Sequence, residues 1–297
     1  MGNDNPSSLI KFCNAATAET ILSSKTLRWS APYLFGDPFE LDQETSFEFD
    51  KPELLENTIK LCSAMIFARE QPKGETPLIT AIRRWRDEER FSSPEEAESV
   101  LKELLSQMLD QRFELLNKML SAWRQYNKTI RICSFSAKPE IIPCWQRFAD
   151  NHRGIAIRFE SNEYVSTKNP VPIEYEQERP ELTTLRNQIS GLLYNTPDTS
   201  KDKFQLMLQR KPIANKSEQE WRCFRQSPKQ DITDDPNDWF DDIKFERSEV
   251  SAVYFGLQTS EEVKARILSI IKQDFSAAKL FQSHLGKNKY EIEMIKM

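Results

Sequence analysis

A long helical pattern between Ser93 and Tyr126 constrains this chain more than any other feature. It begins at Ser93-Pro94-Glu95-Glu96, which combines a capping serine, a proline at the first helical position and acidic residues in the first turn. The apolar residues that follow recur with a helical period, at Ala97, Leu101, Leu104, Met108, Leu115, Met119, Ala122 and Tyr126. The pattern predicts one helix of about thirty residues, about 45 Å long.

Two shorter helical patterns, over 52–69 and 78–90, precede this helix, so residues 50–127 form a predicted helical block. After Asn127 the pattern changes to the alternation that is typical of strands. We expect strands at 25–30, 130–135, 154–159, 171–175, 218–224 and 250–255, and near 278–281 and 290–295. We expect further helices at 17–24, 144–149, 182–194, 201–211 and 261–273. The prediction is a single α+β domain over 1–297, with 50–127 as a helical insertion within it.

Composition excludes several kinds of chemistry. The chain has only 2 His and 7 Gly, so it cannot build a three-histidine metal site, and it lacks the H-E-x-x-H, Walker A and Rossmann motifs. The net charge of −5 argues against a generally basic nucleic-acid binder. Five scattered Cys without a C-x-x-C, together with the absence of a signal-like or membrane-spanning apolar segment, predict a cytoplasmic protein.

Two segments carry residues that suit a binding pocket. Arg28 lies on the expected strand at 25–30, and a guanidinium group can hold phosphate oxygens in a bidentate manner. Ser134 and Ser136 share one face of a later strand, where two hydroxyls could line a polar pocket. Each segment also has a plain structural interpretation, as a solvated strand arginine and as serines that cap a strand end.

A third segment, Glu218-Gln219-Glu220-Trp221-Arg222, places Glu218, Glu220 and Arg222 on one face of an expected strand. A pair of carboxylates could hold a ribose hydroxyl and stabilise an oxocarbenium-like transition state. We expect the like charges to raise the pKa of one carboxyl, and Arg222 to moderate this effect. The alternative is an ordinary charged strand edge that faces solvent.

The order of these three segments is similar to that of the R-S-E class of ADP-ribosyltransferases, although Phe135 stands where that class more often has threonine. The resemblance implies a split mixed or antiparallel sheet of the ADP-ribosyltransferase type, with NAD as co-substrate. It implies that Arg28 binds the pyrophosphate and that Ser134 and Ser136 shape the nicotinamide-ribose pocket. It also implies that Glu220 stabilises the ribosyl cation and that Glu218 positions the acceptor. Trp145 is either a core residue or a pocket wall that stacks on the nicotinamide or a base.

A broader resemblance is to the bacterial domain-of-unknown-function family 2971. The chain resembles that family in six stretches, in the family's order: Leu27–Pro32, Phe35–Glu40, Ser134–Ser136, Cys144–Ile157, Glu218–Arg222 and Val250–Gly256. Gly36 departs from the family's usual asparagine, and Phe148 departs from its usual tyrosine. The family name carries no function of its own.

Other charged or polar residues have simpler interpretations. We expect a structural hydrogen-bonding role for His152, and a solvated loop for the aspartates between Asp231 and Asp242, whose spacing does not match an EF-hand. A basic stretch precedes the glutamate pair at Lys201, Lys203, Arg210, Lys211 and Lys216. It suits either a solvated helix face or a guide for a polyanion.

The sequence therefore leads to three hypotheses. The first is an NAD-dependent ADP-ribosyltransferase that modifies a nucleic acid or a protein, as a toxin or anti-phage defence effector, with an antitoxin or chaperone as a further partner and no membrane association. The second is a non-catalytic module that binds a nucleotide or a partner protein. The third is a metal-dependent nuclease that uses Asp37, Glu40 and the glutamate pair.

Overall fold

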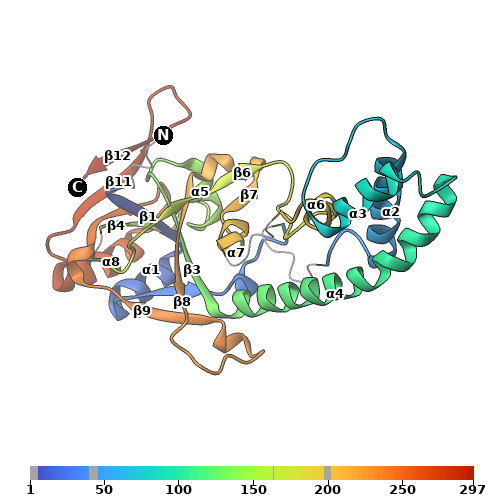
Figure 1. Cartoon of the computed structure of the whole chain (residues 1–297). Helices are drawn as coiled ribbons and strands as arrows, with labels where there is room; N and C mark the ends of the chain where they lie inside the picture. The colour runs from blue at the N-terminus through green and yellow to red at the C-terminus, as the bar shows by residue number, and fades with distance from the viewer. Residues whose placement is uncertain (1–5, 40–45, 163, 197–201) are drawn as a thin grey trace. The chain divides into compact units, whose positions relative to one another are not determined.

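The computed structural model describes residues 6–39, 46–162, 164–196 and 202–297. Contacts within the chain divide it into two compact units. Unit 1 comprises residues 1–41, 127–179 and 208–297, and unit 2 comprises 42–126 and 180–207. The protein is thus mixed α+β, with the sheet in unit 1 and most of the helical residues in unit 2 (Figure 1). Unit 2 takes in residues 180–207, which the sequence analysis did not place with the helical block.

Unit 1 is built on a mostly antiparallel sheet with the strand order β12-β11-β10-β4-β1-β3-β2-β9. Strand β8 lies outside this order: it pairs with β3 and with β5. The only parallel neighbours in this sheet, among the described residues, are β10 and β11. The bounds are β1 Ser8–Cys13, β2 Thr26–Ser30, β3 Ile130–Ser136, β4 Ile155–Glu160, β5 Val171–Pro172, β8 Glu220–Gln226, β9 Phe240–Lys244, β10 Val250–Phe255, β11 Lys279–Leu285 and β12 Ile292–Lys296. A separate parallel pair joins β6 (Glu174–Glu176) to β7 (Arg210–Pro212).

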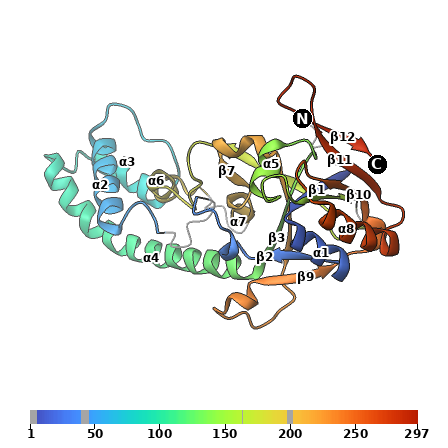
Figure 2. The ribbon, with the colours of Figure 1, turned by 180° about the vertical axis from the view of Figure 1, so that it is seen from behind.

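Alternation along the strands gives this sheet two different faces. On one face Leu9, Phe135 and Phe159 pack in a buried core with helices α1 (Ala15–Ser24) and α8 (Glu261–Asp274), which lie side by side in Figure 2. On the other face Ile10 and Phe12 pack against α5 (Ile142–Arg147). Because α5 is short, it covers only part of this second face. The fold therefore leaves room beside α5 for a pocket.

Unit 2 is helical. It contains α2 (Lys51–Phe67), α3 (Pro77–Asp87), most of α4 (Pro94–Thr129), α6 (Leu185–Tyr194) and α7 (Asp202–Met207). Its main core joins Ile59 and Cys62 of α2, Ile79 of α3, and Leu101 and Leu105 of α4. Helix α4 has 36 residues and starts at Pro94, as its capping sequence predicts, but it runs two residues beyond the predicted end of the helical block. No helix among the described residues is both long enough and apolar enough to cross a membrane.

Several predicted segments differ from the structure, and two of them contain charged residues discussed above. Of the helix expected at 201–211, Lys201 lies outside the described residues, α7 covers Asp202–Met207, and Lys211 lies on strand β7 instead. The expected solvated loop between Asp231 and Asp242 ends in strand β9, which contains Asp241 and Asp242. Short 3₁₀ helices occupy Pro32–Leu34 (η1), Ile213–Glu218 (η2), Pro236–Asp238 (η3) and Arg247–Glu249 (η4).

Candidate functional site

A pocket of about 580 Å³ opens on the sheet face beside α5, within unit 1. Its walls come from strands β1, β3, β7 and β8, from the loop after η1 at 35–38, and from α5 and η2. This volume is in the range of sites that bind small organic molecules. The whole lining belongs to one compact unit, so a single framework holds it.

The pairing of β3 with β8 brings the predicted serines and glutamates together. In this antiparallel pair Ser134 lies opposite Arg222, and Ser136 lies opposite Glu220. Residues directly opposite each other in such a pair project from the same face of the sheet. Ser134, Ser136, Glu220 and Arg222 therefore all line the pocket.

Glu218 also lines the pocket, but it does not lie on the strand that the sequence predicted. Strand β8 begins at Glu220, so Glu218 does not lie on it but is the last residue of η2. Gln219 follows with φ of 46°, a left-handed conformation that turns the chain between the two glutamates. The two carboxylates meet because of this turn, and not because of strand alternation.

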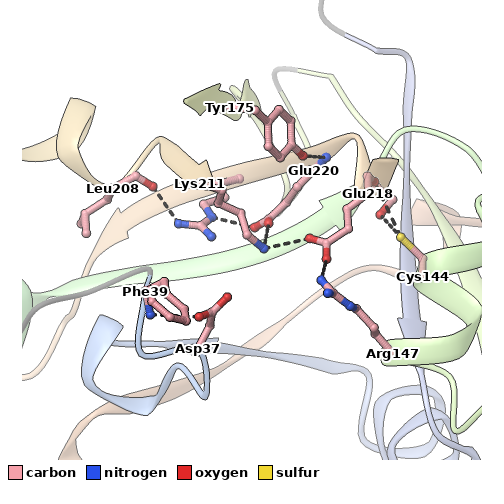
Figure 3. A network of polar contacts seen from close by, with 11 residues as sticks. Asp37, Phe39, Cys144, Arg147, Tyr175, Leu208, Lys211, Glu218 and Glu220 are labelled. Atoms are coloured by element: carbon pink, nitrogen blue, oxygen red, sulfur yellow. Dashed lines mark hydrogen bonds and ion pairs between the residues drawn. The ribbon is translucent and has the colours of Figure 1, made fainter. Parts of the chain in front are cut away.

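A buried ionic network joins these carboxylates (Figure 3). Lys211 Nζ lies 2.8 Å from Glu218 Oε2 and 2.9 Å from Glu220 Oε2. Arg222 Nε lies 2.6 Å from Glu220 Oε1, and Arg147 pairs with Glu218 from the surface side. Each carboxylate is thus held by two cations.

Neutral groups complete the network. Tyr175 Oη accepts a hydrogen bond of 2.8 Å from the Glu220 backbone N–H, and Arg222 donates one of 2.8 Å to the Leu208 carbonyl. Cys144 Sγ lies 3.1 Å from Ser136 Oγ and donates to the Glu218 carbonyl. The Leu208 carbonyl thus holds the Arg222 side chain directly, whereas Tyr175 and Cys144 hold the backbone of Glu220 and Glu218.

The environment sets the protonation of these groups. Burial raises the pKa of Glu220, but the opposing effect of Arg222 and Lys211 is larger and brings that pKa to about 2. For Glu220 the shift is opposite to a raised pKa, because Arg222 and Lys211 both contact its carboxylate. Burial raises the pKa of Cys144 to about 11 and that of Tyr175 to about 12. At neutral pH the network thus contains an ionised Glu220, with a neutral thiol and a neutral phenol behind the pocket lining.

The lining has one positive charge in excess. It carries four cationic side chains (Lys11, Arg147, Lys211 and Arg222) and three anionic ones (Asp37, Glu218 and Glu220). Lys11 Nζ donates to the Ser134 carbonyl at 2.9 Å and lies 5.4 Å from the centre of the Phe135 ring, and it pairs with no carboxylate among the described residues. The Arg147 side chain is 54% exposed, so its remaining donors can reach a ligand. The rest of the lining is largely apolar, with Phe12, Leu34, Phe35, Pro38 and Phe148.

The structure does not bring Arg28 or Trp145 into the pocket lining. Arg28 forms a bidentate pair with Asp242 on β9, with both N–O distances 3.0 Å, and lies 3.8 Å from the centre of the Phe240 ring. Trp145 is fully buried and donates to the Pro139 carbonyl at 2.6 Å. Of the six predicted site residues, four line the pocket, Trp145 is a core residue, and Arg28 pairs with Asp242 outside the pocket.

Sequence reasoning missed Lys211, Arg147 and Lys11 as site residues. Lys211 belonged to a stretch interpreted as a helix face, whereas β7 directs its side chain inward. Arg147 and Lys11 are single charged residues on a short helix and an apolar strand. A period-two pattern places Lys11 on the face opposite Ile10 and Phe12, so nothing local indicated that its ammonium group reaches the pocket.

The residues proposed for a nuclease do not form a metal site in the described part of the chain. Asp37 lines the pocket, and its Oδ1 accepts a hydrogen bond from the Phe39 N–H. Glu40 lies outside the described residues. Within those residues no group of three His, Cys, Asp or Glu is placed to hold a metal ion.

A sequence model of the family described as "Protein of unknown function (DUF2971)" matches residues 144–223. The matched span runs from α5 to β8 and contains Arg147, Lys211, Glu218, Glu220 and Arg222. The family-like stretches at 27–40, 134–136 and 250–256 lie outside it, so the resemblance is supported over well under half of the chain. No curated protein and no solved structure matches this chain.

Proposed function

We propose that the pocket binds a small organic anion with a planar apolar part, of the nucleotide class. The observation that carries this proposal is the composition of the lining, with apolar and aromatic side chains next to an excess of one positive charge. Phe35 and Phe148 supply surfaces for a planar group, while Lys11 and Arg147 supply donors for phosphate oxygens. Ser134 and Ser136 supply hydroxyls for a sugar or an amide.

Binding accounts for the network better than catalysis does. Glu218 and Glu220 are both held by two cations, and such a carboxylate is a weak base and a weak stabiliser of a developing positive charge. A buried ionic network of this kind rigidifies the groups around it. We therefore assign Glu218, Glu220 and Lys211 to holding the pocket in shape.

Titration with ADP-ribose, NAD and ATP tests this proposal. Calorimetry on the full chain should show binding of at least one of them, and Arg147→Ala should weaken that binding about tenfold, the effect of losing one charged hydrogen bond. Glu218 keeps Lys211 as a partner in this variant, so the pocket should stay folded.

The matched control is Arg153→Ala. Arg153 is a similarly exposed arginine that pairs with Asp150 and does not line the pocket, so its loss should leave affinity unchanged. Absence of binding to all three compounds, or equal losses in the two variants, would contradict a nucleotide pocket with Arg147 in contact with the ligand.

A second candidate is NAD-dependent ADP-ribosyl transfer to a nucleic acid or a protein, on a sheet of the ADP-ribosyltransferase type. What favours it is that Ser134, Ser136, Glu218 and Glu220 line one pocket. In this proposal the ribose hydroxyl replaces Lys211 or Arg222 as a partner of Glu220, and pocket cations replace Arg28 at the pyrophosphate. A role as a toxin or defence effector, and an antitoxin or chaperone partner, belong to this candidate.

Release of nicotinamide from NAD separates the two candidates. If the transferase proposal holds, the wild-type protein releases nicotinamide and Glu220→Gln lowers the rate by about a hundredfold, as expected for the loss of a group that stabilises the transition state. Arg28→Ala should keep its rate, because that side chain is paired with Asp242. Binding of NAD without any release, with or without cell extract as a source of acceptor, would leave only the binding function.

A further inference from the structure

Helix α4 carries an exposed apolar stripe that its own unit does not use. Val100, Leu104, Met108 and Leu115 are between 36% and 55% exposed, a high value for large apolar side chains. Their spacings of four, four and seven residues place them along one side of the helix. Single exposed apolar residues are common, but a row of them that extends over more than three turns of a helix indicates a surface that binds a partner.

A separate stripe on the same helix supplies the core of unit 2. Leu101, Leu105, Leu109, Leu116 and Leu120 are buried. Leu104 and Leu105 are neighbours in sequence, but one faces outward and the other lies in the core of unit 2. The outward stripe is therefore not needed to fold the unit, and changes to it can be tested without loss of the core.

The charges on α4 are divided between its two ends. Its first ten residues carry Glu95, Glu96, Glu98 and Glu103 against one lysine, and they include the start of the stripe. Beyond the stripe, Lys118 and Arg124 are exposed, and the helix has no acidic residue after Glu114. A helix with an acidic end and a basic end complements a copy of itself in the antiparallel direction.

We propose that the outward stripe of α4 is the contact between two copies of this chain, with the helices antiparallel. A two-fold axis between Gln107 and Met108 brings Val100 of one copy opposite Leu115 of the other, and Leu104 opposite Gln111. The same axis brings Lys118 beside the acidic turn around Ala97. One patch that meets itself in this way is the usual form of a symmetric dimer.

Sedimentation of the full chain over a range of concentrations tests the dimer. The wild-type protein should sediment as a concentration-dependent dimer, and the double variant Leu104→Glu, Leu115→Glu should dissociate at least about tenfold more readily, because it places charges in the apolar seam. The matched control is Leu285→Glu, a change at an exposed leucine on β11. A wild-type monomer at every concentration, or a double variant as dimeric as the control, would overturn the proposal.

Charge reversal tests the antiparallel direction. Lys118→Glu should weaken the dimer, and adding Glu96→Lys to the same chain should restore it, since the axis places position 96 of one copy beside position 118 of the other and the two charges would again differ in sign. Circular dichroism of each variant checks that the helix is intact. A folded double variant that stays dissociated would overturn the antiparallel arrangement.

Discussion

Glu220 shows how a single residue depends on its neighbours in space. Its folded pKa of about 2 lies below its ordinary value of 4.5, so its ion pairs stabilise the fold fully above about pH 4.5. This stabilisation is lost as the pH falls from there towards 2. We predict that Glu220→Gln lowers the free energy of unfolding by about 3–5 kcal/mol at neutral pH, since it leaves buried cations without a partner.

The same variant should differ less from the wild type in acid. Urea unfolding between neutral pH and about pH 3 measures this difference, which should shrink below about pH 4.5 because the unfolded wild-type chain then binds a proton at Glu220 and the folded chain does not. Glu262→Gln is the control, because Glu262 is exposed and its ion pair with Arg266 contributes little. A difference that is constant with pH, or that grows in acid, would contradict the assignment of Glu220 as the stabilising carboxylate.

Arg28 and Lys211 show where residue-level reasoning reached its limit. Both are basic residues in segments of unremarkable composition, and sequence reasoning chose Arg28 for the site and Lys211 for a solvated surface. The choice between them depends on which strand lies alongside each one. Strand β9 places Asp242 beside Arg28, whereas the η2 turn places Glu218 beside Lys211.

At the scale of elements, the turn from α5 into β4 is held by a close backbone approach at Gly154. A Cβ on this residue would lie 2.3 Å from the Cys13 carbonyl oxygen and 2.9 Å from the backbone of Ala149. Neither atom belongs to a flexible side chain, so the backbone would have to move. We predict that Gly154→Ala lowers the free energy of unfolding by about 1–3 kcal/mol, the usual cost of overpacking.

Gly36→Ala is the matched control for that prediction. A Cβ at Gly36 meets no atom within 4 Å, so its effect on the free energy of unfolding should stay under about 1 kcal/mol. Urea unfolding of the two variants provides the comparison. Equal effects would show that the contact at Cys13 does not constrain the turn.

Elements with a strong local pattern were predicted well. The strand at 250–255 agrees with β10, and α4 begins at the proline that its capping sequence indicates. Strand β9 was missed because Asp241 and Asp242 look like loop residues. Asp241 is buried on that strand because Arg131 of β3 lies 3.0 Å away, a distant partner that no local pattern reveals.

At the scale of the whole molecule, net charge and local charge differ in sign. The chain carries a net charge of −5, yet the pocket lining has one positive charge in excess. Net charge influences solubility and long-range attraction, whereas a ligand interacts with the groups that it contacts. The overall acidity of the chain is therefore compatible with a pocket for an anion.

The sequence by itself determined the α+β class, the long capped helix, most of the strands and the four residues of the serine and glutamate segments that line the pocket. These features follow from composition and from patterns of period and capping that involve only residues close together in the chain. Only the tertiary structure decided that Lys211 joins the two carboxylates, that Arg28 pairs with Asp242, and that one stripe of α4 is buried while its neighbour is exposed. These depend on which segments meet in space, and the energies of charged and apolar groups are set by the neighbours they meet.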